Sequence, residues 1–238
     1  MPEHTVLKIP EKVRDEEAAC RGVPGLTAAM TLWKWLGVGW PPSTSTSTLP
    51  AVADENANWL LVWGGSAETG QFATQLAVHS GWKTITVTSE RTKALSLSLG
   101  ASHVVCRDGK SGQEIVDEIR KITNGRVTKA IDLVGTKTAA LVLGSASKEQ
   151  QVAFAPLAMM AQDQVIPSNV TVHKVEMKQF VLDPTCKVYA ETFNSLISEG
   201  KIAFPDIHVF GGGLEQVVSG LEVLKQGDMG GKKLVVRY

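Results

Sequence analysis

The stretch Gly65-Ser66-Ala67-Glu68-Thr69-Gly70 has the residue types and spacing of a phosphate-binding turn. Compared with the pattern G-x-G-x-x-G, it keeps the first glycine, which permits a tight turn, and the third, which lets a helix pack close to a strand. Ala67 replaces the second glycine, where backbone approaches a dinucleotide pyrophosphate, and Gly64 adds conformational freedom just before the turn. The spacing therefore predicts a dinucleotide-binding turn between a strand and a helix.

Glu68 is the unusual residue of this turn. A full negative charge beside two phosphates opposes binding by about 1–3 kcal/mol at the effective dielectric of a protein surface. The same carboxylate, directed to solvent, interacts favourably with the N-terminus of the following helix. Two interpretations stay open: either Glu68 turns away and a cofactor binds, or Glu68 blocks the site and the cleft serves another purpose.

The end of the second expected strand reads VTSERTKA and carries Ser89, Arg91 and Lys93. In enzymes that prefer NAD, a carboxylate at this tip binds the ribose 2′-hydroxyl. Ser89 together with Arg91 and Lys93 instead suits a 2′-phosphate, which indicates NADPH as the cofactor. The alternative is that the two cations are solvated residues at the start of a helix.

A further candidate site follows a later strand, in the sequence DLVGT. Ligands of open α/β sheets bind at the carboxyl ends of the strands, so we expect Val134 and Gly135 to line the cofactor cleft. Asp132 lies within the strand, and a structural hydrogen-bonding role explains it better than catalysis. No catalytic residue is assigned.

The cysteines and histidines indicate structural roles. Cys20, Cys106 and Cys186 are widely spaced and odd in number, so we expect three reduced structural thiols and no metal site. No histidine pair has the spacing of a helical metal site. His79 is expected to cap the end of the helix that follows the glycine turn.

Short apolar runs rich in Val, Ile and Thr alternate with helical segments from Trp59 onward. The strands expected are Leu60–Trp63, Thr84–Thr88, His103–Val105, Ala130–Val134 and Val152–Ala155, with a strand-like ending KKLVVRY. The helices expected are 71–80, 93–99, 113–123, 138–144, 187–199 and 214–225. Such alternation builds a parallel sheet covered on both faces. The predicted fold is α/β, a doubly wound parallel sheet (Rossmann-like) with an irregular N-terminal arm and C-terminal helices.

The chain divides into two parts. Residues 1–58 are expected to form an N-terminal arm, a helix and a loop rich in Pro, Ser and Thr. Residues 59–238 are expected to form the Rossmann-like dinucleotide-binding domain with a C-terminal extension. Residues 41–57 lack periodicity, and we expect them to be mobile.

The N-terminal helix is expected in two pieces. Carboxylates from Asp15 onward favour a helix start, and Gly22, Pro24 and Gly25 are expected to end that first piece. Apolar spacing then predicts a second helix over Leu26–Leu36.

Composition excludes several functions. The 238 residues are 43% hydrophobic and 20% charged, with 24 basic and 24 acidic residues. A net charge of zero gives no footprint for nucleic acid or an anionic membrane. The start MPEHTVLKIPEK has no signal-peptide core, and no apolar run is long enough to span a membrane. The sequence therefore predicts a cytoplasmic globular protein.

The chain resembles the medium-chain dehydrogenase/reductase superfamily, and within it the fungal trans-acting enoyl reductases of polyketide biosynthesis. The matching stretches are KIPEKVRDEEAACRGVPGLTAAMTLWKWLG, LLVWGGSAETGQFATQLAVHSGW, SLGASHVV, KAIDLVG and GGGLEQVVSGLEVLKQGDMGGKKLVVRY. The resemblance implies NADPH-dependent reduction of a carbon–carbon double bond in an enoyl thioester. It implies a small-molecule or carrier-bound polyketide substrate, a synthase partner and a homodimer.

Members of that superfamily begin with a barrel-like catalytic domain, and HTVLKIP falls near its end. The resemblance thus implies a truncated chain whose residues 1–58 include a remnant of the junction with that domain. Alternatives to a working reductase stay open: a descendant whose redox activity is lost, a non-redox cyclase or isomerase that holds a polyketide-derived substrate in the former cofactor cleft, or a non-catalytic synthase partner.

Overall fold

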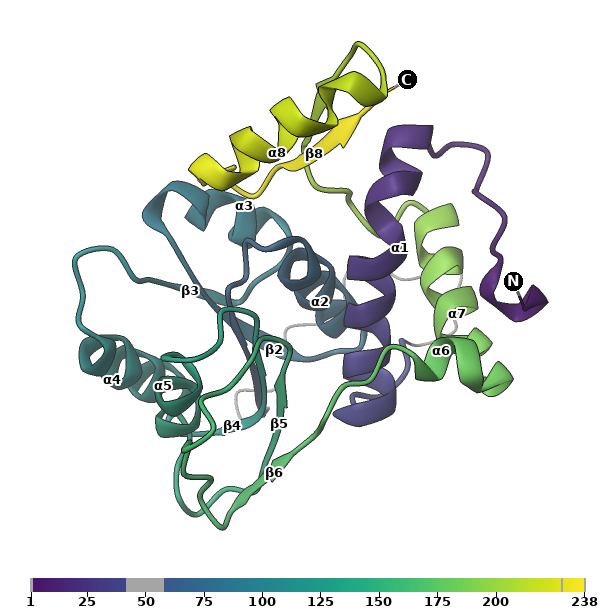
Figure 1. The fold of residues 1–238 in the computed structure, drawn as a ribbon. Helices are drawn as coiled ribbons and strands as arrows, with labels where there is room; N and C mark the ends of the chain where they lie inside the picture. Colours follow the sequence, from purple (N-terminus) through teal and green to yellow (C-terminus); the bar gives the residue numbers. More distant parts are fainter. Residues whose placement is uncertain (1, 42–57, 228, 238) are drawn as a thin grey trace.

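The protein is built around one parallel sheet of six strands (Figure 1). The computed structural model describes residues 2–41, 58–227 and 229–237. The strands lie in the order β3-β2-β1-β4-β5-β6, which is the order of a doubly wound dinucleotide-binding fold. They are β1 (Trp59–Trp63), β2 (Lys83–Thr88), β3 (His103–Cys106), β4 (Val127–Asp132), β5 (Val152–Pro156) and β6 (Val170–Val172). The predicted α/β fold is confirmed.

Helices cover both faces of this sheet. Alternate residues of the central strand point to opposite faces, and because these side chains are apolar, both faces must be buried. Leu60 and Val62 of β1 pack in the apolar cluster formed with α1 and α2, and Leu61 packs in the cluster formed with α4 and α5. All five residues of β1 are buried. The helices are α1 (Asp15–Met30), α2 (Glu68–His79), α3 (Lys93–Ser98), α4 (Gly112–Thr123), α5 (Ala139–Gly144), α6 (Gln179–Leu182), α7 (Lys187–Ser198) and α8 (Val217–Gln226).

A two-stranded parallel sheet, β7 (Ile207–Phe210) with β8 (Lys233–Val236), forms a second layer with α8. Figure 1 shows this layer at the top of the view, beside α1 and above α2 and α3. The sequence indicated β8 but not β7 or β6. Both missed strands are short and contain no buried residue, so neither has the apolar run that marks the central strands.

The expected break in the N-terminal helix is wrong, because α1 continues from Asp15 to Met30 with Pro24 inside it. Tertiary packing explains the continuity: α1 lies against α2 and α7. A Cβ on Gly25 would stand 2.4 Å from the Phe193 ring, so this glycine allows the close approach of α7 rather than ending the helix. A π-helical turn follows over Thr31–Trp35.

The expected strand Ala130–Val134 is also displaced, because β4 ends at Asp132. The Asp132 carboxylate accepts hydrogen bonds from the backbone of Val134 (2.9 Å) and Gly135 (3.2 Å), which turns the chain out of the sheet. The loop predicted to be mobile lies outside the described residues except for Pro41. Among the helices of the described part, none is long and apolar enough to cross a membrane.

Candidate functional site

The glycine turn joins β1 to α2 at the carboxyl edge of the sheet. Gly64 has a φ of 93°, which only glycine adopts readily, and the N–H groups of Gly64 and Gly65 both donate to the Val87 carbonyl of β2 (3.0 and 3.1 Å). The Ala67 N–H donates to the Gly64 carbonyl at 3.0 Å, which closes the turn. The predicted strand–turn–helix arrangement is therefore confirmed, with α2 starting at Glu68 rather than at Gln71.

Two glycines of the turn are required by close packing. A Cβ on Gly65 would lie 2.6 Å from the Thr86 side chain, and one on Gly70 would lie 2.5 Å from the Gly64 carbonyl oxygen. The second contact is with backbone and cannot be relieved by moving a side chain. Gly70 thus brings the first turn of α2 against the end of β1, as the sequence spacing predicts.

Glu68 occupies the first helical position of α2, after Ala67, whose methyl group cannot accept a hydrogen bond from the helix N-terminus. Its carboxylate forms an ion pair with Lys233 of β8, Oε1 to Nζ 2.9 Å. Both side chains are partly exposed. The ion pair neutralises the Glu68 charge that would repel a pyrophosphate, and its lysine comes from a segment more than 160 residues away in the sequence.

The segment before β8 lies over the glycine turn. Gln71 Nε2 donates to the Ser66 carbonyl (2.9 Å) and to the Gly231 carbonyl (2.7 Å), so one amide holds the turn and the C-terminal segment together. A Cβ on Gly230 would lie 3.0 Å from the Arg91 guanidinium. In the sequence, GDMGGKK marks a glycine-rich turn before a strand, but nothing in it connects this segment with the glycine turn.

The tip of β2 carries the three residues expected at the adenosine end. Ser89 Oγ shares a hydrogen bond with Thr92 Oγ1 (2.9 Å), and Lys93 Nζ lies 3.8 Å from Glu90 Oε1 in an exposed ion pair. Arg91 lies beside the C-terminal segment. Thr69 follows Glu68 in the first turn of α2. The fold thus brings the glycine turn, the β2 tip and the C-terminal segment to one edge.

The β4 tip completes this edge. Asp132 is fully buried, and besides its two backbone bonds it accepts from the Thr138 hydroxyl at 2.8 Å, so its structural role is confirmed. Val134 is 54% exposed, and a Cβ on Gly64 would lie 3.3 Å from its side chain. A Cβ on Gly135 would lie 2.7 Å from Ala158 Cβ. The Asp132 network therefore fixes the loop that carries Val134 and Gly135.

The cysteines are free, buried thiols, as expected. Burial, together with the nearby negative charge of Glu68, raises the pKa of the Cys20 thiol to about 11, and burial with Glu90 does the same for Cys106. Such thiols are protonated and unreactive at neutral pH. His79 lies in the last turn of α2, as expected, but its Nε2 donates to the Lys201 carbonyl (2.7 Å) and so ties α2 to the segment after α7.

The sheet order and the glycine turn define a Rossmann-like fold of the dinucleotide-binding type. A family profile described as zinc-binding dehydrogenase matches residues 69–198, so this chain belongs to the zinc-binding dehydrogenase family, within the medium-chain dehydrogenase/reductase superfamily. The described residues contain no group of three His, Cys, Asp or Glu placed to hold a metal ion. That part of the chain does not fit the zinc of the family's name.

Among curated proteins, the chain is similar to trans-enoyl reductases. It is 27% identical to the trans-enoyl reductase sthE of Phaeosphaeria nodorum, covering 98% of this chain and 67% of the relative. It is 28% identical to eqxC of Fusarium heterosporum, covering 98% and 68%. The chain thus spans about two thirds of the length of these relatives, and the predicted resemblance is confirmed.

Solved structures share the fold. A quinone oxidoreductase from Pseudomonas syringae superposes with a TM-score of 0.75 at 18% identity, over 99% of this chain and 69% of that chain. The CurK enoyl reductase gives a TM-score of 0.74 at 17% identity, over 97% and 64%.

Proposed function

We propose that this chain forms the cofactor-binding part of an NADPH-dependent enoyl reductase of polyketide biosynthesis. Support comes from relatives named trans-enoyl reductases and from the glycine turn, whose packing matches a dinucleotide site. The substrate is a carrier-bound or small-molecule enoyl thioester. NADPH, when bound, supplies the hydride for the double bond.

The Glu68–Lys233 ion pair is the observation that carries the proposal. An unpaired Glu68 would repel a pyrophosphate, whereas the pair presents no net charge to it. In the proposed site, the turn residues Gly65, Ser66, Ala67, Thr69 and Gly70 hold the pyrophosphate at the N-terminus of α2. Ser89, Arg91 and Lys93 hold the 2′-phosphate, and Val134 and Gly135 border the nicotinamide end.

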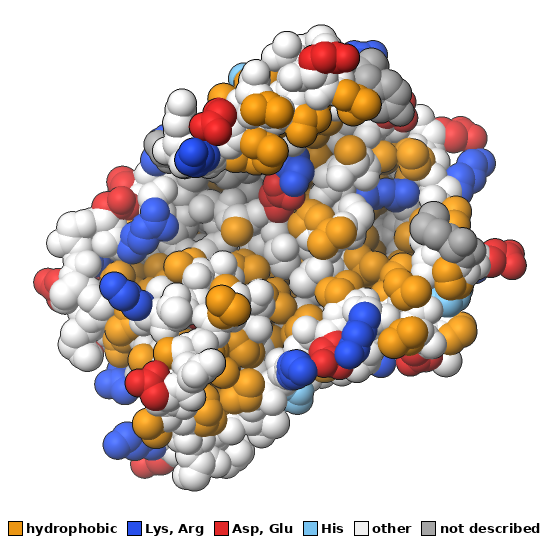
Figure 2. All heavy atoms as spheres, in the orientation of Figure 1, with side chains coloured by type: hydrophobic (Ala, Val, Ile, Leu, Met, Phe, Trp, Pro, Cys, Tyr) orange, Lys and Arg blue, Asp and Glu red, His pale blue; other side chains and the backbone are white. Residues whose placement is uncertain are grey.

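A protein partner is part of the proposal. Figure 2 shows hydrophobic side chains gathered along α8 and, below it in this view, over the body of the molecule. Leu214, Val218 and Leu221 on and before α8 are 70%, 69% and 58% exposed. An apolar face of this kind marks a contact with another protein surface, which here is a synthase or a second copy of this chain.

Titration calorimetry with NADPH and NADH tests the cofactor proposal. The wild-type chain should bind NADPH more tightly than NADH. Lys233→Met should weaken NADPH binding about tenfold or more, because it leaves the Glu68 charge unpaired. Glu68→Gln should bind at least as tightly as the wild type. Lys225→Met, which removes a lysine from the exposed Glu222 pair of α8, is the matched control and should change nothing.

The opposite pattern would overturn the proposal. If the wild type binds neither nucleotide while Glu68→Gln binds NADPH, the cleft has been reassigned. The non-redox cyclase or isomerase, or the non-catalytic synthase partner, would then be the better interpretation.

A further inference from the structure

An apolar pocket lies away from the glycine turn, between the N-terminal arm, α1, α6 and α7. Figure 1 shows these four segments grouped on one side of the molecule, although α6 and α7 are distant from α1 in sequence. The pocket has a volume of about 430 Å³, within the range of small-molecule sites. Its lining residues are Thr5, Leu7, Ala18, Arg21, Gly22, Val23, Leu26, Met177, Phe180, Ala190, Phe193 and Asn194.

The walls of this pocket are hydrophobic. Phe180 and Phe193 are 8% and 4% exposed, and Leu7, Leu26 and Met177 pack against the apolar cluster that contains Phe180. A hydrogen bond from the His4 ring to the Phe180 carbonyl (2.9 Å) fastens the arm to α6. The walls therefore suit an aliphatic chain.

Arg21 of α1 is the single charged side chain in this lining, and it is only 8% exposed. Burial lowers the pKa of Arg21, and no carboxylate in the described ranges of the chain forms an ion pair with it. Two of the three acids in the first turn of α1 are engaged elsewhere: Glu17 pairs with Arg14 (2.9 Å), and Glu16 pairs with Arg237 (3.4 Å). A buried cation without a counter-charge is costly, so its presence needs an explanation.

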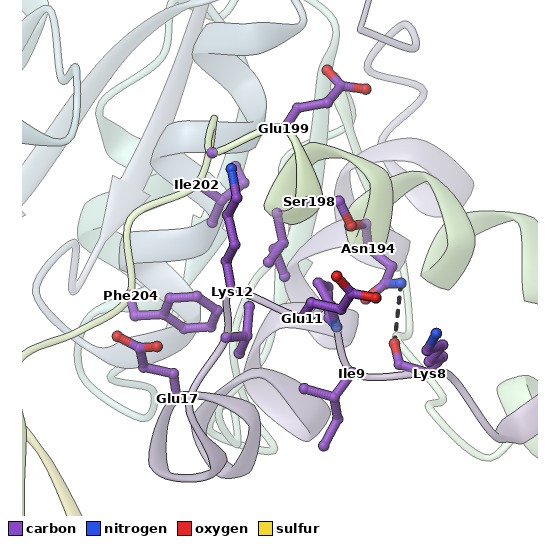
Figure 3. A pocket seen from close by; sticks show the side chains of 14 residues that line it. Lys8, Ile9, Glu11, Lys12, Glu17, Asn194, Ser198, Glu199, Ile202 and Phe204 are labelled. Carbon is purple, nitrogen blue, oxygen red and sulfur yellow. Dashed lines mark hydrogen bonds between the residues drawn. The ribbon is translucent and has the colours of Figure 1, made fainter.

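The partners of Arg21 hold the guanidinium in place but leave its charge unmatched. Nη1 donates to Asn194 Oδ1, and Nη2 donates to the Lys8 carbonyl at 3.4 Å. Asn194 Nδ2 donates to that same carbonyl at 3.3 Å, which Figure 3 shows as a dashed line beside a neighbouring pocket. Two neutral oxygens thus accept from a group with five N–H donors, which leaves donors for an anionic oxygen.

We propose that this pocket binds an aliphatic monocarboxylate, with its carboxylate on Arg21 and its hydrocarbon tail along Leu26, Phe180 and Met177. Charge complementarity and apolar walls together select this class, since a neutral alkane would leave Arg21 unpaired and a small anion would leave the walls unfilled. Neither the comparisons nor the reductase proposal assigns a ligand here. The inference is independent of cofactor binding at the glycine turn.

Gly22 gives a second way to test the pocket. It lines the pocket, and a Cβ at this position would meet nothing within 4 Å. Gly22 is exposed, so a leucine here would meet no backbone clash and would add bulk at the rim of the pocket, and replacing glycine inside a helix favours folding. The Gly22→Leu chain should fold and yet have no room for the tail.

The experiment is calorimetry and thermal denaturation of the full chain with octanoate as the probe. Octanoate should bind and raise the melting temperature. Octanol, octylamine and acetate should each bind at least about tenfold more weakly, because each lacks the charge or the tail. Arg21→Met should reduce octanoate affinity about tenfold to a hundredfold. Gly22→Leu should abolish binding.

Arg120→Met, which removes an exposed arginine from α4, is the matched control and should bind octanoate like the wild type. Equal binding of octanoate and octanol by the wild type would overturn the role of Arg21. Undiminished binding in Arg21→Met or Gly22→Leu, with both variants folded by circular dichroism, would overturn the site itself, as would an absence of octanoate binding by the wild type.

Discussion

Lys233 of β8 lies beside the start of α2, and Arg21 belongs to α1, but the surroundings of the two cations differ. Lys233 has a carboxylate 2.9 Å away and is partly exposed, whereas Arg21 is buried with only an amide and a carbonyl oxygen as acceptors. At the glycine turn the protein therefore satisfies its charges internally. In the pocket between α1 and α7, the positive charge of Arg21 has no carboxylate partner among the described residues. The charge of Lys233 is balanced by a carboxylate of the protein itself, whereas the charge of Arg21 can be balanced only by a bound anion.

The largest expected effect is a change in the free energy of unfolding, and it is tested by substituting one glycine from each region. Gly70→Ala places a methyl group 2.5 Å from the Gly64 carbonyl, so it should destabilise the fold by about 2–3 kcal/mol. Gly22→Ala meets open space within a helix and should stabilise it by about 0.5–1 kcal/mol. Urea denaturation measures both. Equal effects of the two substitutions would contradict the packing described for the turn.

The next expected effect is a pH dependence of stability that arises from Cys20, which lies near the glycine turn. The pKa of Cys20 is raised to about 11 from an ordinary value near 9, so the folded state favours the protonated thiol. This contribution to stability is fully present below about pH 9 and is lost as pH rises towards 11. Denaturation midpoints should fall across that window in the wild type and fall less in Cys20→Ala. Parallel curves for the two chains would remove Cys20 as the cause.

Arg21→Met should leave stability unchanged or raise it by about 1 kcal/mol in the absence of ligand, because it replaces an unpaired buried charge with an apolar side chain of similar length. Thermal and urea denaturation check this, with Arg120→Met as the control. A loss of more than about 2 kcal/mol would show that the guanidinium is held by its neutral partners for structural reasons.

The smallest expected effect concerns Lys93. Its side chain is 46% exposed and paired with Glu90, so Lys93→Met should lower the preference for NADPH over NADH by only about twofold to threefold. Competition binding with the two nucleotides measures the ratio. A much larger loss would mean that Lys93, rather than its neighbours at the β2 tip, dominates recognition of the 2′-phosphate.

The sequence predicted those parts of the fold that depend on local pattern. The buried runs of β1 and β2 and the turn glycines are visible from their neighbours alone, because strand period and turn geometry act over a few residues. The continuity of α1 was missed because the contact that uses Gly25 comes from Phe193, far along the chain. Tertiary packing there overrides the helix-breaking tendency of glycine and proline.

Part of the candidate site likewise could not be predicted from the sequence. Gly65 and Gly70 follow from motif spacing, but Lys233 enters through β8, and no local signal connects it to Glu68. Arg21 gave no signal at all, since a single arginine within a helix pattern is ordinarily solvated. Only the folding of the arm and α7 around it reveals that its charge is unmatched.

The ion pair between Glu68 and Lys233 also has a consequence for how the two positions evolve. Each residue alone introduces an unbalanced charge beside the glycine turn, and together they cancel. Loss of Lys233 alone should therefore be selected against, because it leaves the Glu68 charge unpaired, whereas loss of Glu68 alone leaves a cation that favours a pyrophosphate. Across related genes, a loss of the lysine at position 233 should therefore accompany a loss of the carboxylate at position 68, although 164 positions separate the two in the sequence.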